Sequence, residues 1–113
     1  MKGRLFFKTG VVVAMVLPWL VMHAEAADLS SSRRVDLENL LTQDCGSCHG
    51  LTLKGGLGPP LTPEAVSDTS LDVLIETITH GRPLNAMPPW GPLLAPAEIR
   101  WLAERLKRGV SAP

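Results

Sequence analysis

The sequence has few aromatic residues and no excess of charge of either sign. Among its 113 residues there is no Tyr, and both Phe lie within the first ten positions. The 11 basic and 11 acidic side chains cancel, which excludes the broad basic face that nucleic-acid binding requires. The length allows one small domain and excludes a multidomain enzyme.

No apolar run is long enough for a membrane span. The longest, residues 11–22, is interrupted by Pro18, whereas a spanning helix needs about 20 residues. Basic residues precede this run and Ala-Glu-Ala follows it at 24–26, as in a cleaved secretory signal peptide; an uncleaved membrane anchor is the alternative. We predict cleavage after Ala26, export to the periplasm and no stable membrane insertion afterwards.

Residues 27–113, the predicted mature domain, offer only a thin core. Their aromatic side chains are Trp90 and Trp101 alone. A domain of this size usually needs additional stabilisation from a disulfide, a metal or a cofactor. We therefore expect a group other than polypeptide to fill the centre.

Three stretches of this domain have the period of amphipathic helices. The first covers residues 35–45, with Ser32 as a possible N-cap. The second follows Ser70 and ends at Gly81, and the third begins at Pro96 and ends before Gly109. The inward positions of the third are Ile99, Leu102, Ala103 and Leu106. Segments rich in Gly and Pro separate the helices, and no stretch has a convincing strand pattern, so the predicted fold class is all-α.

The residues that carry the chemistry are Cys45, Cys48 and His49. Cys-x-x-Cys-His is the attachment signature of haem c, in which each thiol adds to a vinyl group and the His binds iron. Two intervening residues let one helical turn present both sulfurs to one edge of the flat ring. We predict one covalently attached haem c, held by these three residues.

Three other roles of a Cys pair compete with this interpretation: a structural disulfide, half of a zinc site and a thioredoxin-like redox pair. Each lacks a companion feature. The disulfide leaves His49 unexplained, and the zinc site has only His80 or a carboxylate to complete it. The redox pair expects a preceding strand, where the pattern is helical.

Met87 is the candidate for the second axial ligand of the iron. It is the only Met in residues 27–113, and two prolines follow it, which restricts the segment that holds its thioether. A Met that fills a gap in the core is the alternative. His80 is a rival ligand, although its place at a helix end before Gly81 favours an exposed imidazole.

With these residues, the mature domain resembles the class I c-type cytochromes, which are small all-helical monohaem carriers. The resemblance covers nearly the whole domain and rests on the motif at 45–50, Gly-Pro-Pro-Leu at 58–61, the stretch at 81–90 and a closing amphipathic helix. Residues 55–61 with 87–91 are similar to cytochrome c-55X, the NirC type associated with the cytochrome nitrite reductase of denitrifying bacteria.

The resemblance implies a small class I cytochrome c fold, with three to four helices around one haem. It also implies that the Pro59 carbonyl accepts a hydrogen bond from the His49 nitrogen that faces away from iron. The first helix lacks the Gly and the aromatic residue by which many relatives pack their first and last helices, so other residues must do this packing. They are Leu37, Leu40 or Leu41 against Trp101 and Leu102.

Two protein ligands would leave the iron no position for a substrate, which favours electron transfer over catalysis. We therefore expect a non-enzymatic carrier whose partners are periplasmic redox proteins, and the resemblance adds cytochrome nitrite reductase to them. It also allows a role in maturing the d-type haem of that reductase. A gas-binding sensor, in which Met87 detaches from the iron, is a third hypothesis.

Overall fold

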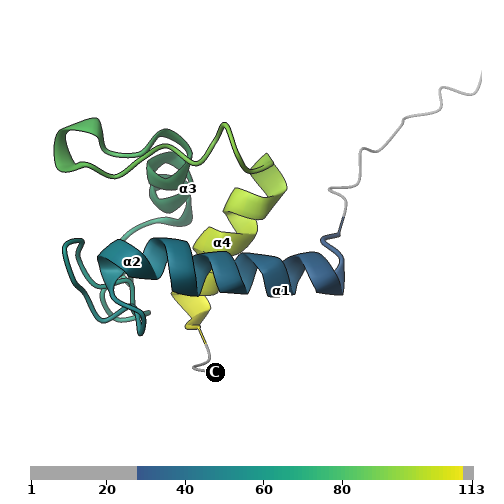
Figure 1. Ribbon diagram of the computed structural model, residues 1–113, viewed down its shortest axis with the longest axis horizontal. Coiled ribbons are helices and arrows are strands. Elements are labelled where there is room, and N and C mark those ends of the chain that lie inside the picture. The colour runs from purple at the N-terminus through teal and green to yellow at the C-terminus, as the bar shows by residue number, and fades with distance from the viewer. Residues whose placement is uncertain (1–27, 111–113) are drawn as a thin grey trace, which may run out of the picture.

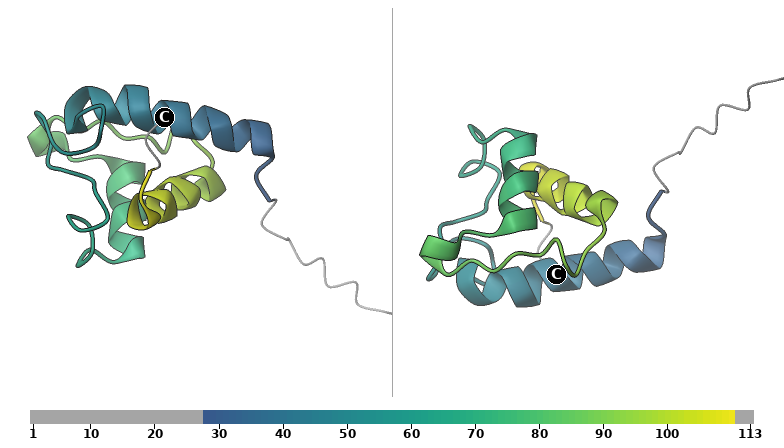
Figure 2. Two further views of the ribbon diagram at one scale, coloured as in Figure 1. Left: turned by 90° about the horizontal axis from the view of Figure 1, so that it is seen from below. Right: turned by 90° about the horizontal axis from the view of Figure 1, so that it is seen from above.

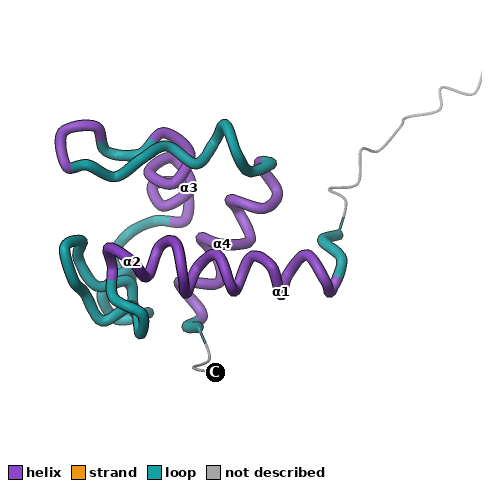
Figure 3. Tube along the Cα trace, viewed as in Figure 1, coloured by secondary structure: helices purple, strands orange, loops and turns teal. Residues whose placement is uncertain are grey.

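The computed structural model describes residues 28–110, and the predicted signal peptide, residues 1–26, lies outside this range. Its elements in chain order are α1 (Ser31–Leu40), the π turn η1 (Leu41–Cys45), α2 (Gly46–His49), α3 (Leu71–His80), the 3-10 turn η2 (Pro83–Asn85) and α4 (Pro96–Arg108). Over residues 28–110 the only β-type pairing is an isolated bridge between Arg82 and Met87. The predicted all-α fold is therefore confirmed (Figures 1 and 3). No helix in this range is long and apolar enough to cross a bilayer.

α1, η1 and α2 follow one another without a break and form one long first helix (Figure 1). The predicted N-cap, Ser32, is wrong. Ser30 caps this helix, because its Oγ accepts a hydrogen bond from the Arg33 N–H at 3.2 Å, whereas Ser32 already lies inside the first turn. The helix also runs on to His49, beyond the predicted end at residue 45.

The predicted limits of α3 and α4 are confirmed. Ser70 caps α3 by accepting a hydrogen bond from the Val73 N–H at 3.3 Å, and Gly81 ends it. Pro96 occupies the first turn of α4, where its missing N–H costs nothing, and Gly109 follows the last turn.

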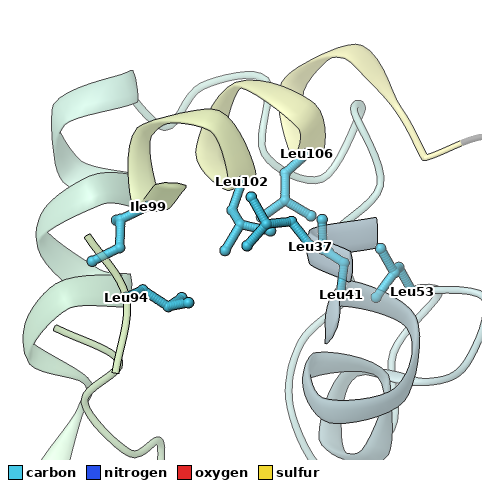
Figure 4. Close-up of a cluster of buried hydrophobic side chains, with 7 residues drawn as sticks. All are labelled: Leu37, Leu41, Leu53, Leu94, Ile99, Leu102 and Leu106. Carbon is cyan, nitrogen blue, oxygen red and sulfur yellow. The ribbon is translucent and has the colours of Figure 1, made fainter. Parts of the chain in front are cut away.

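The core lies where the long first helix crosses α4 (Figure 4). Leu37 and Leu41 pack against one face of α4, and Leu53 and Leu94 close the cluster from the loops. The predicted inward residues of α4 are all buried; they are Ile99, Leu102, Ala103 and Leu106. The leucines of the first helix thus provide the packing expected of them, with Leu40 and Trp101 half-buried at the edge of the cluster.

Two ion pairs join the same two helices. Arg33 Nε lies 2.6 Å from Glu98 Oε1, and Arg105 Nε lies 2.8 Å from Glu38 Oε1. The Arg33 guanidinium and the Ala95 N–H, which both donate to the Glu98 carboxylate, hold the pKa of Glu98 below its usual range. The contact between the first helix and α4 is therefore stabilised by two ion pairs as well as by leucine packing.

Lys107 connects α4 to the turn that precedes α3. Its ammonium donates to the carbonyls of Val66, Ser67 and Thr69 at 3.0, 3.3 and 2.6 Å. Lys107→Met is expected to lower the free energy of unfolding by about 1.5–3 kcal/mol, because these carbonyls lose a charged donor. Denaturant unfolding of the haem-loaded protein measures this loss. Lys54→Met, at an exposed lysine, is the control, and equal stability of both variants would contradict the role given to Lys107.

Candidate functional site

A cavity of about 490 Å³ opens between the end of the long first helix and two loops. The loops are residues 50–70, here called the Pro59 loop, and residues 81–95, here called the Met87 loop (Figures 1 and 2). Every site residue predicted from the sequence lines this cavity: Cys45, Cys48, His49, Pro59 and Met87. Most of the remaining wall is apolar, and its large apolar side chains are Leu40, Leu41, Leu57, Leu61, Val66, Leu74, Ile78, Trp90, Leu102 and Leu106.

The π turn brings the Cys pair to the cavity. The Gly46 N–H donates to the Leu41 carbonyl five residues earlier, rather than four, so the helix is widened just before the motif. Cys45 is half-buried against the core cluster and Cys48 is exposed, and both thiols are free. The two sulfurs thus stand at the wall of the cavity from successive turns of one helix.

Cys45 does not have the properties of a redox-active thiol. Burial raises its pKa to about 11, and the neighbouring Asp44 carboxylate adds to this rise. Thioredoxin-like cysteines act through a lowered pKa, and they follow a strand, whereas Cys45 follows a helix. The structure therefore disfavours a dithiol redox pair at this position.

The His49 imidazole is held from its Nδ1 side by the Pro59 loop. Nδ1 lies 2.7 Å from the Pro59 carbonyl, to which it donates, so Nε2 is left to act as a ligand. Backbone bonds tie the loop to the same end of the helix: the Gly55 N–H donates to the His49 carbonyl and the Gly58 N–H to the Cys48 carbonyl, both at 2.8 Å. The orientation of the ring is thus fixed by the fold.

Gly58 is a site residue that the sequence analysis did not single out for a role of its own. A Cβ at this position would lie 2.7 Å from both Cε1 and Nδ1 of His49. The backbone of residue 58 therefore packs directly on the ring face. The Gly-Pro pair signals a turn, but it does not signal the contact of Gly58 with a ring nine residues earlier in the chain.

Gly58→Ala is expected to displace the imidazole and to destabilise the haem-loaded protein by about 1–3 kcal/mol, the usual range for overpacking. Thermal unfolding and the haem content per polypeptide measure the effect. Lys54→Ala is the control, because Lys54 is exposed on the same loop and does not line the cavity. A Gly58→Ala protein with the stability and haem content of the Lys54→Ala protein would show that the close contact is unimportant.

Met87 faces the cavity from the opposite loop, and the rival ligand does not reach it. Met87 is half-buried and lines the cavity, as do half-buried Trp90 and exposed Arg82. His80 is exposed, lies outside the lining and pairs with Glu76, whose Oε1 is 3.4 Å from its Nε2. The geometry therefore favours Met87 over His80 as the second axial residue.

The residues present fit a covalently attached haem. A flat apolar macrocycle needs apolar walls, two thiols at one edge, and nitrogen or sulfur donors that can reach its metal. The cavity has this lining, with the two thiols, an imidazole whose Nε2 is free to bind, and one thioether. Over residues 28–110 no group of three or more His, Cys, Asp or Glu side chains is placed to hold a bare metal ion.

Comparisons with known proteins agree with this site. Residues 34–104 match the family described as "Cytochrome C oxidase, cbb3-type, subunit III". Cytochrome c55X of Stutzerimonas stutzeri is 51% identical over 106 residues, which cover 94% of this chain and 92% of that protein. A solved structure titled "c-type cytochrome NirC" is 49% identical, with a TM-score of 0.69 over 71% of this chain and 94% of that one.

A second solved structure is titled "Dihydro-heme d1 dehydrogenase NirN in complex with DHE". It is 35% identical with a TM-score of 0.60, and the match covers 66% of this chain but 16% of that one. The matched part is therefore a single region of a much longer protein. The cytochrome c relatives and the site together assign covalently bound haem c to this chain. The chain belongs to the c-type cytochromes, as a member of the cytochrome c55X family.

Proposed function

We propose that this protein is an exported monohaem carrier that transfers single electrons in the nitrite reductase system of denitrification. In this proposal residues 1–26 direct export and are removed, and residues 27–113 act in the periplasm. Cys45 and Cys48 form the thioether links, and His49 and Met87 bind the iron. The observation that carries the proposal is that all four residues line one apolar cavity, with His49 oriented by Pro59.

The haem, when bound, supplies a one-electron couple between ferric and ferrous iron. The chain's own residues determine how that couple is used. His49 and Met87, if both bind the iron, would leave it no position for a substrate. The soft thioether of Met87 and the apolar wall would both favour the less charged ferrous state, so a comparatively high reduction potential is expected.

Two exposed leucines mark where a partner would touch the protein. Leu57, on the Pro59 loop, is 95% exposed and lines the cavity, and Leu84, at the tip of the Met87 loop, is 99% exposed. Rapid turnover requires a small, short-lived contact, and an apolar rim provides one without strong ion pairs.

Leu57→Ser combined with Leu84→Ser is expected to slow electron exchange with the partner about threefold or more, while the reduction potential stays unchanged. Stopped-flow mixing measures the rate and a redox titration measures the potential. Leu93→Ser is the control, because Leu93 is exposed but neither it nor its two chain neighbours line the cavity. Leu84, in contrast, directly precedes Asn85, which does line it. Equal rates for the double variant and the control would place the contact elsewhere.

The link to nitrite reductase is supported by the similarity to cytochrome c55X and NirC. Its test is to mix the reduced protein with oxidised cytochrome nitrite reductase in a stopped-flow apparatus. Oxidation of the carrier within the turnover time of the reductase is the expected result. No electron transfer would reject this partner.

A second function is favoured by the similarity to dihydro-heme d1 dehydrogenase. In that case the protein would accept electrons from a step in the maturation of the d-type haem. The test is to mix the oxidised protein with such a dehydrogenase and its dihydro-haem substrate. Reduction of the carrier here, together with inertness toward nitrite reductase, would select the maturation role.

A further inference from the structure

The segment that bears Met87 is a closed turn. The Arg82 N–H donates to the Met87 carbonyl at 2.9 Å, and the two residues form the one β-bridge found over residues 28–110. Between them, η2 is closed by a bond from the Asn85 N–H to the Arg82 carbonyl, also at 2.9 Å. Ala86 then takes the left-handed conformation, with φ 60° and ψ 12°, so that the chain can return to the bridge.

The chain beyond Met87 is fastened to the end of α3. The Trp90 N–H donates to the Ile78 carbonyl and the Gly91 N–H to the Thr79 carbonyl, both at 3.0 Å. Carbonyls in the last turn of a helix lack partners within the helix, so these bonds satisfy groups that would otherwise need water. Met87 is therefore held between a bridge on one side and a helix end on the other.

Gly81 makes this arrangement possible. It ends α3 with φ 68° and ψ −168°, a conformation that is almost restricted to glycine. A Cβ at this position would collide with the Met87 carbonyl oxygen, and it would lie 2.7 Å from both the Pro88 carbonyl carbon and the Pro89 nitrogen. The backbone of residues 87–89 thus passes directly over residue 81, where no side chain fits.

We propose that Gly81 and Ala86 are positioning residues that set where the Met87 sulfur stands in the cavity. The inference rests on the proposed ligation by Met87. A Met side chain has three rotatable bonds and adapts readily, so the placement of its sulfur depends on how firmly its backbone is held. The two conformations needed at positions 81 and 86 therefore control how strongly the thioether competes for the iron.

Imidazole competition on the ferric, haem-loaded protein tests the proposal. Free imidazole binds only where the thioether gives way, so its apparent affinity reports how well Met87 is held. Gly81→Ala is expected to bind imidazole about tenfold more tightly than the wild type, since a non-glycine residue in this conformation strains the closed turn. It is also expected to weaken the thioether-to-iron absorption band near the red end of the spectrum, with haem attachment unchanged.

Gly109→Ala is the matched control. Gly109 also ends a helix with a positive φ, of 91°, but a Cβ there would meet only the Pro63 ring. Its imidazole affinity is expected to stay within about twofold of the wild type. The same affinity in Gly81→Ala and Gly109→Ala would overturn the role given to Gly81.

A second pair keeps the test decisive if Gly81→Ala yields no haem protein. Ala86→Val places a β-branched residue in the left-handed region, whereas Ala95→Val places one in extended backbone with φ −67° and ψ 153°. Both positions are exposed. Tighter imidazole binding only in Ala86→Val supports the proposal, and equal binding in the two valine variants rejects it.

Met87→Ala separates this inference from the function on which it rests. If Met87→Ala binds imidazole no better than the wild type, Met87 is not the ligand and the proposed site is wrong. If Met87→Ala binds it far more tightly while the variants at 81 and 86 do not, the ligation stands and only the positioning role fails.

Discussion

Replacing Cys45 and Cys48 by Ala is expected to abolish covalent haem attachment and, with it, most of the folded structure. The reason lies in the small core. The large apolar side chains that line the cavity come from the long first helix, the Pro59 loop, α3 and α4, so they face one another across the haem site. Without the bound group the cavity would hold water against half-buried side chains such as Leu61, Ile78 and Trp90, and the buried side chains that remain are too few to stabilise the predicted mature domain.

Two measurements check this prediction: the intact mass, which shows whether haem is attached, and far-ultraviolet circular dichroism, which shows whether the helices form. Ser47→Ala is the control between the two cysteines, because Ser47 is exposed and its hydroxyl donates only to the Asp44 carbonyl and, at 3.9 Å, to Cys48 Sγ. A double cysteine variant that unfolds cooperatively at the temperature of the wild type would disprove the dependence of the fold on haem.

Met87→Ala is expected to leave haem attached but to remove the thioether from the iron. The absorption band near the red end of the spectrum should disappear. The reduction potential should fall by about 0.1 V or more, a part of the range of about 0.8 V over which axial ligands set it. The reduced variant should also bind carbon monoxide rapidly, because the sixth position is open.

His80→Ala is the control for this result. His80 is exposed and paired with Glu76, so its removal should change neither the band nor the potential. Retention of the band in Met87→Ala and its loss in His80→Ala would reverse the ligand assignment. Rapid carbon monoxide binding to the wild-type protein would instead favour the gas-sensor hypothesis.

The limits of α3 and α4 can be predicted from the sequence because each depends on a residue at the helix end itself. Ser70, Gly81, Pro96 and Gly109 act through their own side-chain or backbone preferences within one turn. The start of the first helix is less well defined, because three serines in a row can each serve as a cap. In the structure Ser30 is the cap, and Arg33 in the first turn reaches Glu98 of α4.

The candidate site is predictable only as a set of residue types. The Cys-x-x-Cys-His motif and the single Met of the mature domain indicate the chemistry, since few side chains bind haem iron. The packing of Gly58 on the imidazole and of Gly81 under residues 87–89 depends on loops that return to the helix ends. Such contacts have no local signal beyond the glycines themselves.

The wide turn at 41–45 also decides which changes of length the first helix tolerates. A regular α-helix advances about 100° per residue, so a single insertion between Leu37 and Cys45 would swing the thiols away from the porphyrin edge. The π turn from Leu41 to Gly46 contains one residue more than a turn of α-helix. It therefore accommodates one extra residue without rotating the rest of the helix. A shorter version of the chain, with one residue deleted in this turn, would keep its cysteines in phase with Leu37. We therefore expect attachment helices of the two lengths to place their thiols alike relative to the residue that packs at position 37.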